Sequence, residues 1–349
     1  MANTMKAAVL HKAHDLRMEE VPKPSIQNPD DVLVRIGSIG VCGSDVHFLE
    51  RGRIGDFVVE KPVILGHEAA GTVEEVGPAV TTLEPGDRVS IEPGRPCRRC
   101  EFCHRGEYNL CIDMYFLAAP PVHGAFCEYL VWPADYLHAL PENVSLDEGA
   151  MCEPLAVGMW AATRAKVKPG DIAAVLGSGP IGLTSLQAAA YFGATTIIVT
   201  DFVPFRLEAA KRMGATHVID LNEADAVEAV MDITGGRGVD VVFECAGAIP
   251  STQQAILMAR NGGSVQLVGM PSVDEFELPV YTMIGKELNV GGLFRYANCY
   301  GPCVAGIAAG KVDVKSLITH SYSLEDTPEA MAFARDAKDE ALKVVVNPG

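Results

Sequence analysis

Basic residues are scarce in this chain. Its 349 residues include 28 lysines and arginines against 45 aspartates and glutamates, which gives a net charge of −17. A surface this negative repels phosphate backbones and anionic lipid headgroups. We therefore expect neither nucleic acid nor a membrane surface as a partner.

Signals for export or membrane insertion are missing as well. Residues 1–10 hold a brief apolar run but no hydrophobic region of ~7–15 residues and no small-residue cleavage site, which predicts a cytoplasmic protein. Residues 172–200 carry no charge, but glycine, proline and hydroxyl residues break them into the short runs typical of buried parallel strands around a helix. We find no internal repeat.

The composition, 48% hydrophobic and 21% charged, is that of a globular protein. At roughly 150 residues per domain the length predicts two domains. Because a chain of this size can bury a large core without cross-links, its 10 cysteines favour metal binding or catalysis over disulfides.

Two patterns divide the chain. Up to about Cys152, short strands broken by glycine and proline predict a mainly antiparallel β domain, with strands at 5–10, 31–39, 69–76, 88–91 and 125–131. From about Gly170, strands and helices alternate, which predicts an α/β domain with a doubly wound parallel sheet. Its strands are expected at 172–176, 196–200, 217–220, 239–245, 263–268 and 288–291, and its helices at 180–192, 205–213 and 251–259. A strand at 342–346 can return to the first domain.

A dinucleotide motif follows the strand at 172–176. Gly177, Gly179 and Gly182 form GxGxxG at the start of a helix, where the glycines allow a tight turn, close approach to a pyrophosphate and close helix packing. Asp201 ends the next strand near the expected ~20-residue offset and can accept hydrogen bonds from both ribose hydroxyls, which favours NAD over NADP. Two interpretations of Arg206 stay open, contact with the adenosine and a solvated helix residue. A glycine-rich turn without a ligand is the alternative for the whole motif.

Four cysteines share one loop. Their CxxCxxCx7C spacing can close a tetrahedron of thiolates, the arrangement that structural zinc prefers. An iron–sulfur cluster and four unrelated buried thiols are the alternatives. The predicted ligands are Cys97, Cys100, Cys103 and Cys111.

A third set of residues is dispersed. Cys42 lies in CGSDVH, His67 and Glu68 lie in GHE, and Glu153 lies in CEPL. Sulfur, nitrogen and oxygen donors of this kind suit a zinc ion that keeps an open position, although spacing alone cannot join them.

In combination these motifs resemble the zinc-dependent medium-chain dehydrogenase/reductase family, and CGSDVH, GHE, EPLAVG and Phe294-Arg295-Tyr296 look like its polyol branch, the sorbitol and xylitol dehydrogenases. The resemblance covers essentially the whole chain. It implies a GroES-like catalytic domain made of residues 1–154 and 296–349, and a Rossmann NAD-binding domain at 155–295. It also implies a catalytic zinc in addition to the structural one, and a homotetramer.

The resemblance further implies roles for individual residues. Cys42, His67 and Glu68 would bind zinc, although Glu68 has an outer-sphere alternative, and Glu153 would either bind zinc or hold its water. Ser44 and His47 are candidates to carry the alcohol proton outward, with a backbone hydrogen bond as the alternative for Ser44. The NAD contacts implied beside the glycines, Asp201 and Arg206 are Pro180, Ile181, Val268, Gly269, Met270, Leu293, Phe294 and Arg295. The implied substrate contacts are Phe48, Glu153, Arg295 and Tyr296.

Two departures from the polyol branch stand out. Phe48 occupies a position where tyrosine is common, so one hydroxyl that could bind a sugar alcohol is missing. The chain also retains the four-cysteine loop that some animal relatives lack.

The expected function is oxidation of a secondary hydroxyl of an alditol such as sorbitol or xylitol to the ketose. Zinc would lower the pKa of the bound alcohol, and the resulting alkoxide would pass hydride to NAD. Threonine or butanediol dehydrogenation is the alternative within the family, and a non-catalytic protein that binds NAD or zinc is the alternative of another class.

Overall fold

The computed structural model describes residues 4–271, 273 and 275–349. These residues form two compact units. Among the described residues, unit 1 consists of 4–153, 300–309 and 314–349, and unit 2 of those within 154–299 and 310–313. Gly310 to Asp313 belong to unit 2 because Gln187 pairs with the backbone of Asp313 through two hydrogen bonds of 3.0 and 2.6 Å. The sequence had not separated this short segment from the C-terminal tail.

Unit 1 is built mainly from antiparallel strands. Its largest sheet has the order β12-β8-β7-β3-β20-β19, with β11 also paired to β3. The strands are β3 (Asp31–Gly40), β7 (Glu68–Val76), β8 (Arg88–Ile91), β11 (Tyr129–Pro133), β12 (Leu137–Ala139), β19 (Ile318–Ser323) and β20 (Lys343–Asn347). The C-terminal strand β20 pairs with β3, so the expected return of the tail to the N-terminal β domain is found.

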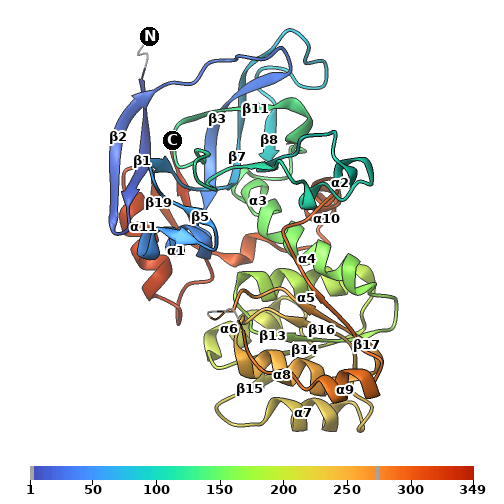
Figure 1. The fold of residues 1–349 in the computed structure, drawn as a ribbon. Coiled ribbons are helices and arrows are strands. Elements are labelled where there is room, and N and C mark those ends of the chain that lie inside the picture. The colour runs from blue at the N-terminus through green and yellow to red at the C-terminus, as the bar shows by residue number, and fades with distance from the viewer. Residues whose placement is uncertain (1–3, 272, 274) are drawn as a thin grey trace. The chain divides into compact units, whose positions relative to one another are not determined.

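Smaller sheets and short helices complete unit 1 (Figure 1). A three-stranded sheet has the order β2-β1-β6, and two sheets of two strands pair β4 with β5 and β9 with β10. These strands are β1 (Thr4–Lys12), β2 (Asp15–Pro22), β4 (Arg53–Ile54), β5 (Phe57–Val58), β6 (Val63–Ile64), β9 (Gly94–Arg95) and β10 (Tyr115–Phe116). The helices are α1 (Gly43–Arg51), α2 (Glu101–His104), α3 (Leu146–Ala150), α10 (Tyr300–Ala308) and α11 (Thr327–Asp336).

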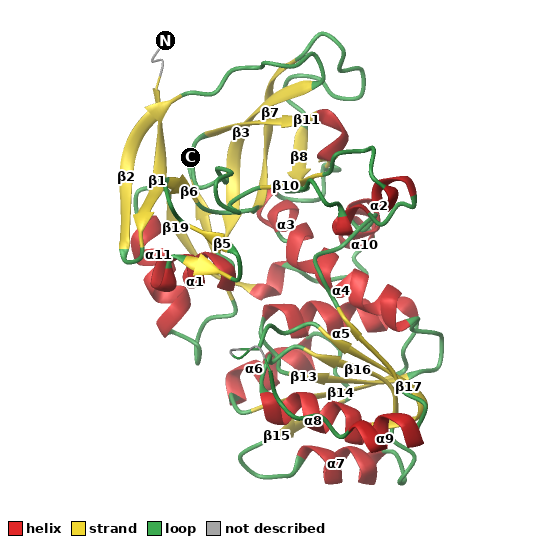
Figure 2. Ribbon diagram, in the orientation of Figure 1, coloured by secondary structure: helices red, strands yellow, loops and turns green. Residues whose placement is uncertain are grey.

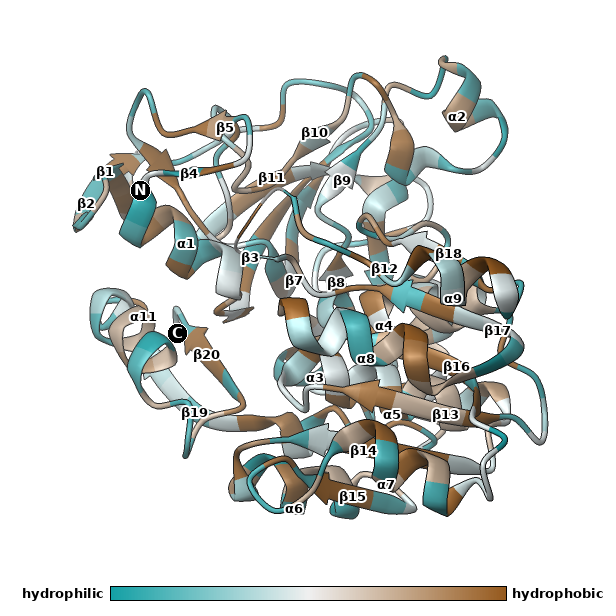
Figure 3. Cartoon of the chain, turned by 60° about the horizontal axis from the view of Figure 1, so that its bottom comes forward, coloured by the Kyte–Doolittle hydropathy of each residue, from teal (hydrophilic) through white to brown (hydrophobic). Residues whose placement is uncertain are grey.

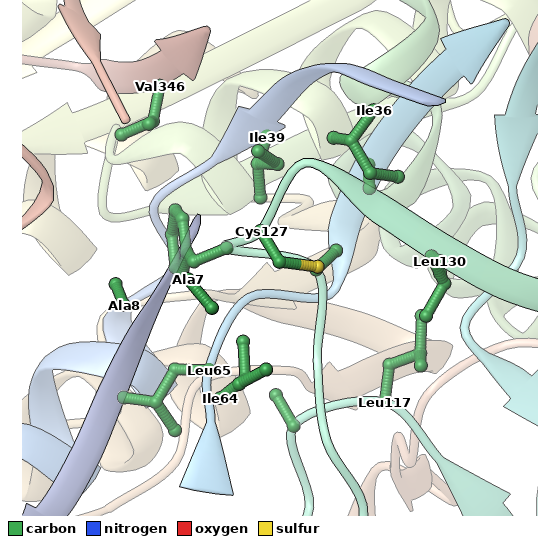
Figure 4. Packing of buried hydrophobic residues seen from close by; sticks show 14 of the residues in the cluster. Ala7, Ala8, Ile36, Ile39, Ile64, Leu65, Leu117, Cys127, Leu130 and Val346 are labelled. Atoms are coloured by element: carbon green, nitrogen blue, oxygen red, sulfur yellow. The ribbon is translucent and has the colours of Figure 1, made fainter. Parts of the chain in front are cut away.

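The core of unit 1 lies between these sheets. Figure 4 shows Cys127 packed among aliphatic side chains, including Ile64, Leu117 and Leu130. All four are less than a tenth exposed. Burial raises the pKa of the Cys127 thiol to about 12, so this cysteine behaves as a small apolar residue.

One predicted strand of this unit begins later than expected. The predicted strand at 125–131 forms strand β11 only from Tyr129 onward. The backbone N–H groups of Gly124, Ala125 and Phe126 instead donate to carbonyls of the segment 64–66, which holds that loop against the residues before β7.

Unit 2 is a doubly wound α/β domain, as predicted. Six parallel strands have the order β15-β14-β13-β16-β17-β18, the arrangement of a dinucleotide-binding fold. They are β13 (Ile172–Leu176), β14 (Thr196–Asp201), β15 (His217–Asp220), β16 (Val239–Glu244), β17 (Ala259–Leu267) and β18 (Asn289–Gly292). In Figure 3 the strands β13, β14 and β16 are coloured mainly toward the hydrophobic end of the scale, in keeping with their burial.

Helices cover both faces of this sheet (Figure 2). The helices of this unit are α4 (Cys152–Ala165), which begins at the end of unit 1, α5 (Pro180–Phe192), α6 (Pro204–Arg212), α7 (Ala226–Ile233), α8 (Ile249–Met258) and α9 (Val280–Gly285). Glycine permits close helix packing, because a Cβ on Gly158 of α4 would lie 2.6 Å from the backbone of Thr184 in α5. Among the described residues, no helix is both long and apolar enough to cross a membrane.

Candidate metal centres and dinucleotide site

Three of the dispersed ligand candidates come together in unit 1. One donor atom each from Cys42, His67 and Glu68 can be chosen so that all three lie within 4.8 Å of one another. Cys42 immediately precedes α1, His67 precedes β7, and Glu68 begins β7. A thiolate, an imidazole and a carboxylate at this separation fit a zinc ion, and His67 and Glu68 are buried.

Asp45 holds the backbone around two of these residues. One carboxylate oxygen accepts a hydrogen bond of 3.0 Å from the N–H of Cys42, and the other accepts one of 3.0 Å from the N–H of Gly66. The Nδ1 atom of His67 lies 3.8 Å from this carboxylate, too far for a hydrogen bond. Asp45 therefore positions both ligands through their backbone segments and forms no hydrogen bond with the imidazole.

The electrostatics of this cluster favour a cation. Burial by itself lowers the pKa of His67, but the Cys42 thiolate, Asp45 and Glu153 outweigh it, and the pKa is raised well above the ordinary histidine value. The negative groups that stabilise an imidazolium here stabilise a divalent metal ion in the same way, and a bound metal would keep His67 neutral.

Glu153 lies in the first turn of α4 and is buried. It is not part of the group within 4.8 Å, although its charge acts on both His67 and Lys343. Whether Glu153 binds a metal directly or through water therefore stays a prediction.

Lys343 is a member of this cluster that sequence reasoning missed. Its ammonium donates to both carboxylate oxygens of Glu68 at 2.7 Å. Lys343 is 4% exposed and Glu68 is 1% exposed. The available signal was a lysine at the start of the apolar run KVVVN, because a lysine in a buried strand requires an anionic partner.

The two candidate proton carriers lie on α1. His47 is half-buried, and burial, with Arg51 and Lys338 nearby, lowers its pKa below the ordinary value. Its Nδ1 atom is buried and has no hydrogen-bond partner among the described residues. The Ser44 hydroxyl likewise forms no hydrogen bond within the described residues, so the simple alternative, a bond to backbone, is not found.

The four predicted cysteines of the loop also form one cluster. One sulfur from each lies within 4.8 Å of every other, which fits a tetrahedral zinc ion. Hydrogen bonding by the backbone of Cys103 is the largest of several effects that lower the pKa of Cys100 to about 6, so a thiolate is already favoured there. All ten cysteines are free thiols, so disulfides are excluded in this structure.

Glu92 anchors this cysteine loop to the sheet of unit 1. Its buried carboxylate accepts hydrogen bonds from the hydroxyl of Tyr108 at 2.7 Å and from Nε2 of His138 at 3.0 Å. Tyr108 lies between Cys103 and Cys111. This link, which no sequence motif indicates, ties the loop to β12.

The glycine-rich turn of unit 2 has the geometry that a dinucleotide requires. Gly177 adopts a φ of +89°, which favours glycine, and donates its N–H to Thr200. A Cβ on Gly182 would overlap the carbonyl oxygen of Gly177, whereas one on Gly179 would meet only the Arg206 guanidinium, at 3.8 Å. The middle glycine therefore leaves open space beside the start of α5.

Asp201 is held firmly at the end of β14. One oxygen accepts from the N–H and the hydroxyl of Ser178 at 2.7 and 2.8 Å, and the other accepts from the N–H groups of Phe202 and Val203 at 2.7 and 3.0 Å. The carboxylate is thereby kept at one place, and its negative charge disfavours a 2′-phosphate nearby.

A cavity of about 710 Å³ in unit 2 contains this turn. Gly177, Gly179, Asp201 and Arg206 line it, so these four predicted cofactor residues share one space. Its size suits the adenosine part of a dinucleotide. Pro180, Ile181 and Gly182 are at the start of the adjoining helix α5.

A second acidic residue shapes the next loop of unit 2. Glu244 ends β16, and its side chain accepts from the N–H groups of Ala246 and Gly247 and from the hydroxyl of Ser251. Its carbonyl accepts from Val268 and Gly269 at 2.8 Å each. Glu244, absent from the predicted site, thus supports the 268–270 segment that the family resemblance connects with NAD.

The remaining residues predicted to contact substrate or NAD differ in their exposure to solvent. Phe48 is 5% exposed and belongs to the core of unit 1. A position in an apolar core accepts a side chain without a hydroxyl. The burial of Phe48 does not favour direct contact with a substrate. Arg295 stacks on exposed Phe294, Tyr296 is buried, and Met270 is exposed. The roles of these residues and of Leu293 stay predictions.

Known proteins resemble the chain over its whole length. Residues 28–142 match the alcohol dehydrogenase GroES-like domain, and residues 180–308 match the zinc-binding dehydrogenase domain. Sorbitol dehydrogenase of Bacillus subtilis is 49% identical over 99% of this chain and 97% of its own. D-xylulose reductase A of Aspergillus oryzae is 43% identical over 95% of this chain and 93% of its own.

A solved structure shows the same fold. An oxidoreductase/dehydrogenase of unknown specificity from Escherichia coli aligns over 99% of both chains with a TM-score of 0.95 and 38% identity. Together with the matched domains, the cysteine loop and the glycine-rich turn, these relatives confirm the family that the motifs indicated: the chain belongs to the zinc-binding, GroES-like alcohol dehydrogenase family.

Proposed function

We propose that this protein is an NAD- and zinc-dependent polyol dehydrogenase that oxidises a secondary hydroxyl of an alditol such as sorbitol or xylitol to the ketose. The observation that carries the proposal is the convergence of Cys42, His67 and Glu68 in one buried cluster. The names of the sorbitol dehydrogenase and D-xylulose reductase relatives support the substrate class.

Different residues of the chain would bind the metal and the cofactor. Cys42 and His67 would bind the metal, and Glu68 or Glu153 would add negative charge around it. Asp45 fixes the positions of the two backbone segments that carry Cys42 and His67. When bound, zinc supplies Lewis acidity that polarises an alcohol oxygen, and NAD supplies the hydride acceptor. Asp201 would orient the adenosine ribose, and the backbone around Gly179 would accommodate the pyrophosphate.

His47 would receive the proton that leaves the alcohol, with the Ser44 hydroxyl between them. Because the pKa of His47 is lowered, its proton-accepting form persists to a pH below the ordinary histidine range. We expect alditol oxidation by the native protein to fall as the pH decreases through that lowered pKa. His47→Asn should reduce kcat by ~10²-fold, flatten this acidic limb, and regain activity when imidazole is added.

The measurement is kcat against pH for the native protein and His47→Asn. His11→Asn is the matched control, because His11 pairs with Glu19 in the β1–β2 hairpin. An unaltered acidic limb in His47→Asn would exclude His47 as the proton carrier.

The substrate class is tested by NADH absorbance with purified protein, NAD and a panel of sorbitol, xylitol, galactitol, ribitol, threonine and 2,3-butanediol, each with and without a zinc chelator. We expect turnover of alditols that the chelator abolishes. Turnover of threonine or the diol alone would assign the protein to that substrate class instead of the alditols. No turnover of any substrate would favour a non-catalytic protein.

Assembly and location are further parts of this proposal. The proposal includes a cytoplasmic location and a homotetramer. Family resemblance supports the tetramer, and the mass of the purified protein in solution tests it. One zinc would be catalytic, and the four-cysteine loop would hold a second, structural one.

A further inference from the structure

A second cavity of unit 2, of about 400 Å³, lies where strand β13 begins. Its lining comes from the end of α4, from the loop 166–171 that leads into β13, and from β16, β17 and β18. The glycine-rich turn follows the other end of β13, and the cavity that contains this turn shares no lining residue with the second one. The two spaces are therefore separate.

Part of the lining is a polar patch on the sheet. Ser264 and Gln266 alternate along β17, and Ser264 pairs with Asn289 of β18, so these three side chains lie on one face. Parallel sheets usually carry apolar side chains on both faces. A polar patch at this position favours a polar ligand.

Gln266 can donate hydrogen bonds into this space. It is 5% exposed, and its Nε2 donates to the Ser264 hydroxyl at 3.1 Å, while its amide oxygen has no partner among the described residues. The two ends of an amide can exchange places by rotation. After that rotation the oxygen accepts from Ser264, and the amide N–H groups are available to an anion.

Four cations line the cavity, namely Arg164, Lys166, Lys168 and Arg260. The side chains of Arg164, Lys166 and Lys168 form no ion pair among the described residues. The chain has 45 acidic and only 28 basic residues, so a cation on its surface usually has a carboxylate within reach. Three unpaired cations around one cavity therefore favour an anionic ligand.

The two carboxylates that line the cavity already have partners. Asp240 is buried and accepts from Arg237 at 2.7 and 3.0 Å and from Nε of Arg260 at 2.5 Å. Asp171 accepts from the N–H of Lys168 at 2.8 Å. The Nη2 group of Arg260 has no hydrogen-bond partner among the described residues. Four lining cations against two carboxylates leave this space positively charged.

We infer that this cavity binds a phosphate group, either free or carried by a small molecule. A phosphate group offers several strong acceptor oxygens and up to two negative charges, so it can accept from ammonium, guanidinium and amide donors at the same time. The volume falls within the range of small-molecule sites, ~300–1,000 Å³. The inference involves neither the catalytic metal nor an alditol, so it does not depend on the proposed function.

The test is calorimetric titration of the zinc-loaded protein with inorganic phosphate, in chloride buffer at constant ionic strength and with saturating NAD. The NAD occupies the glycine-rich turn, the other place in unit 2 where a phosphate group can bind. We expect saturable binding of one phosphate per chain. A second titration uses glycerol 2-phosphate. Tighter binding of this ester would identify a phosphorylated small molecule as the ligand, and equal or weaker binding would identify free phosphate.

Variants locate the bound phosphate. The double variant Lys166→Gln with Lys168→Gln should weaken phosphate binding by ~10-fold or more, because charge-assisted hydrogen bonds are lost. Gln266→Leu should weaken it by roughly 5-fold, since the amide donors are lost. The matched control is Lys311→Gln with Lys315→Gln, which removes the same charge at two exposed lysines outside the cavity and should keep the native Kd.

Three results contradict the inference. The first is the absence of saturable phosphate binding to the native protein with NAD bound. The second is an equal loss of affinity in the Lys166 and Lys168 double variant and in its control, which would show that phosphate responds only to overall charge. The third is native affinity in that double variant, which would place the bound phosphate elsewhere. Lys166 and Lys168 are exposed, so the decisive variant does not disturb the packed core.

Discussion

Replacing Cys42 with serine is expected to lower alditol oxidation by at least ~10³-fold, because a bound metal contributes several kcal/mol of transition-state stabilisation. Serine keeps the size of the side chain but replaces a thiolate, the soft ligand of the set, with a hydroxyl that stays protonated. Zinc per chain should decrease from two to one, since the four-cysteine loop does not involve Cys42.

Two matched cysteine variants control this result. Cys127→Ser alters a buried thiol outside both clusters, whose contact with the carbonyl of Tyr129 at 3.2 Å a hydroxyl can keep, so both zinc ions and activity should remain. Cys100→Ser should lose the other zinc ion. Metal content by mass spectrometry and initial rates are the measurements, and a Cys42→Ser protein with two zinc ions and native rates would contradict the assigned ligand.

Replacing Asp201 with asparagine is expected to lower kcat/KM for NAD by ~10²-fold. A hydrogen bond to a charged group contributes ~1.5–3 kcal/mol, and asparagine offers the ribose one neutral oxygen in place of a carboxylate. At the same time kcat/KM for NADP should rise, because repulsion of the 2′-phosphate ends while Arg206 remains in the same cavity. The ratio of kcat/KM for NAD to kcat/KM for NADP should therefore decrease sharply or fall below one.

Asp201 also stabilises the glycine-rich turn. A loss of activity caused by damage to this turn therefore has to be distinguished from a loss of cofactor recognition. Ser178→Ala removes the hydroxyl bond to Asp201 but keeps the carboxylate, and it should retain the preference for NAD. Asp220→Asn makes the same chemical change at the end of the neighbouring strand β15 and should have little effect. Equal losses with NAD and NADP in Asp201→Asn would indicate a damaged turn instead of altered recognition.

Several elements of unit 2 could be predicted to the residue. The strand Ile172–Leu176, the helix Pro180–Phe192 and the strand His217–Asp220 have the expected bounds. Local signals enclose the first two. Ile172–Leu176 is an apolar run of strand length followed by glycine, and the helix begins at Pro180 and ends before Gly193, so neighbouring residues suffice to define both.

In unit 1 the local signals were weaker. Ala125 and Phe126 have the composition of a strand, but they bond to the segment 64–66 as a loop. Their partner lies far away in the sequence, and the choice between strand and loop is made by that long-range contact.

The sequence by itself determined the two-domain organisation, the α/β class of unit 2, the cysteine loop and the dinucleotide turn, because the residues of each motif are neighbours in the chain. Only the tertiary structure brought Cys42 to His67, directed Asp45 to two backbone N–H groups, and buried Lys343 against Glu68. The pairing of β3 with both β7 and β20 brings Glu68 and Lys343 together, and two charges buried this deeply require each other as partners. No spacing along the chain encodes these contacts.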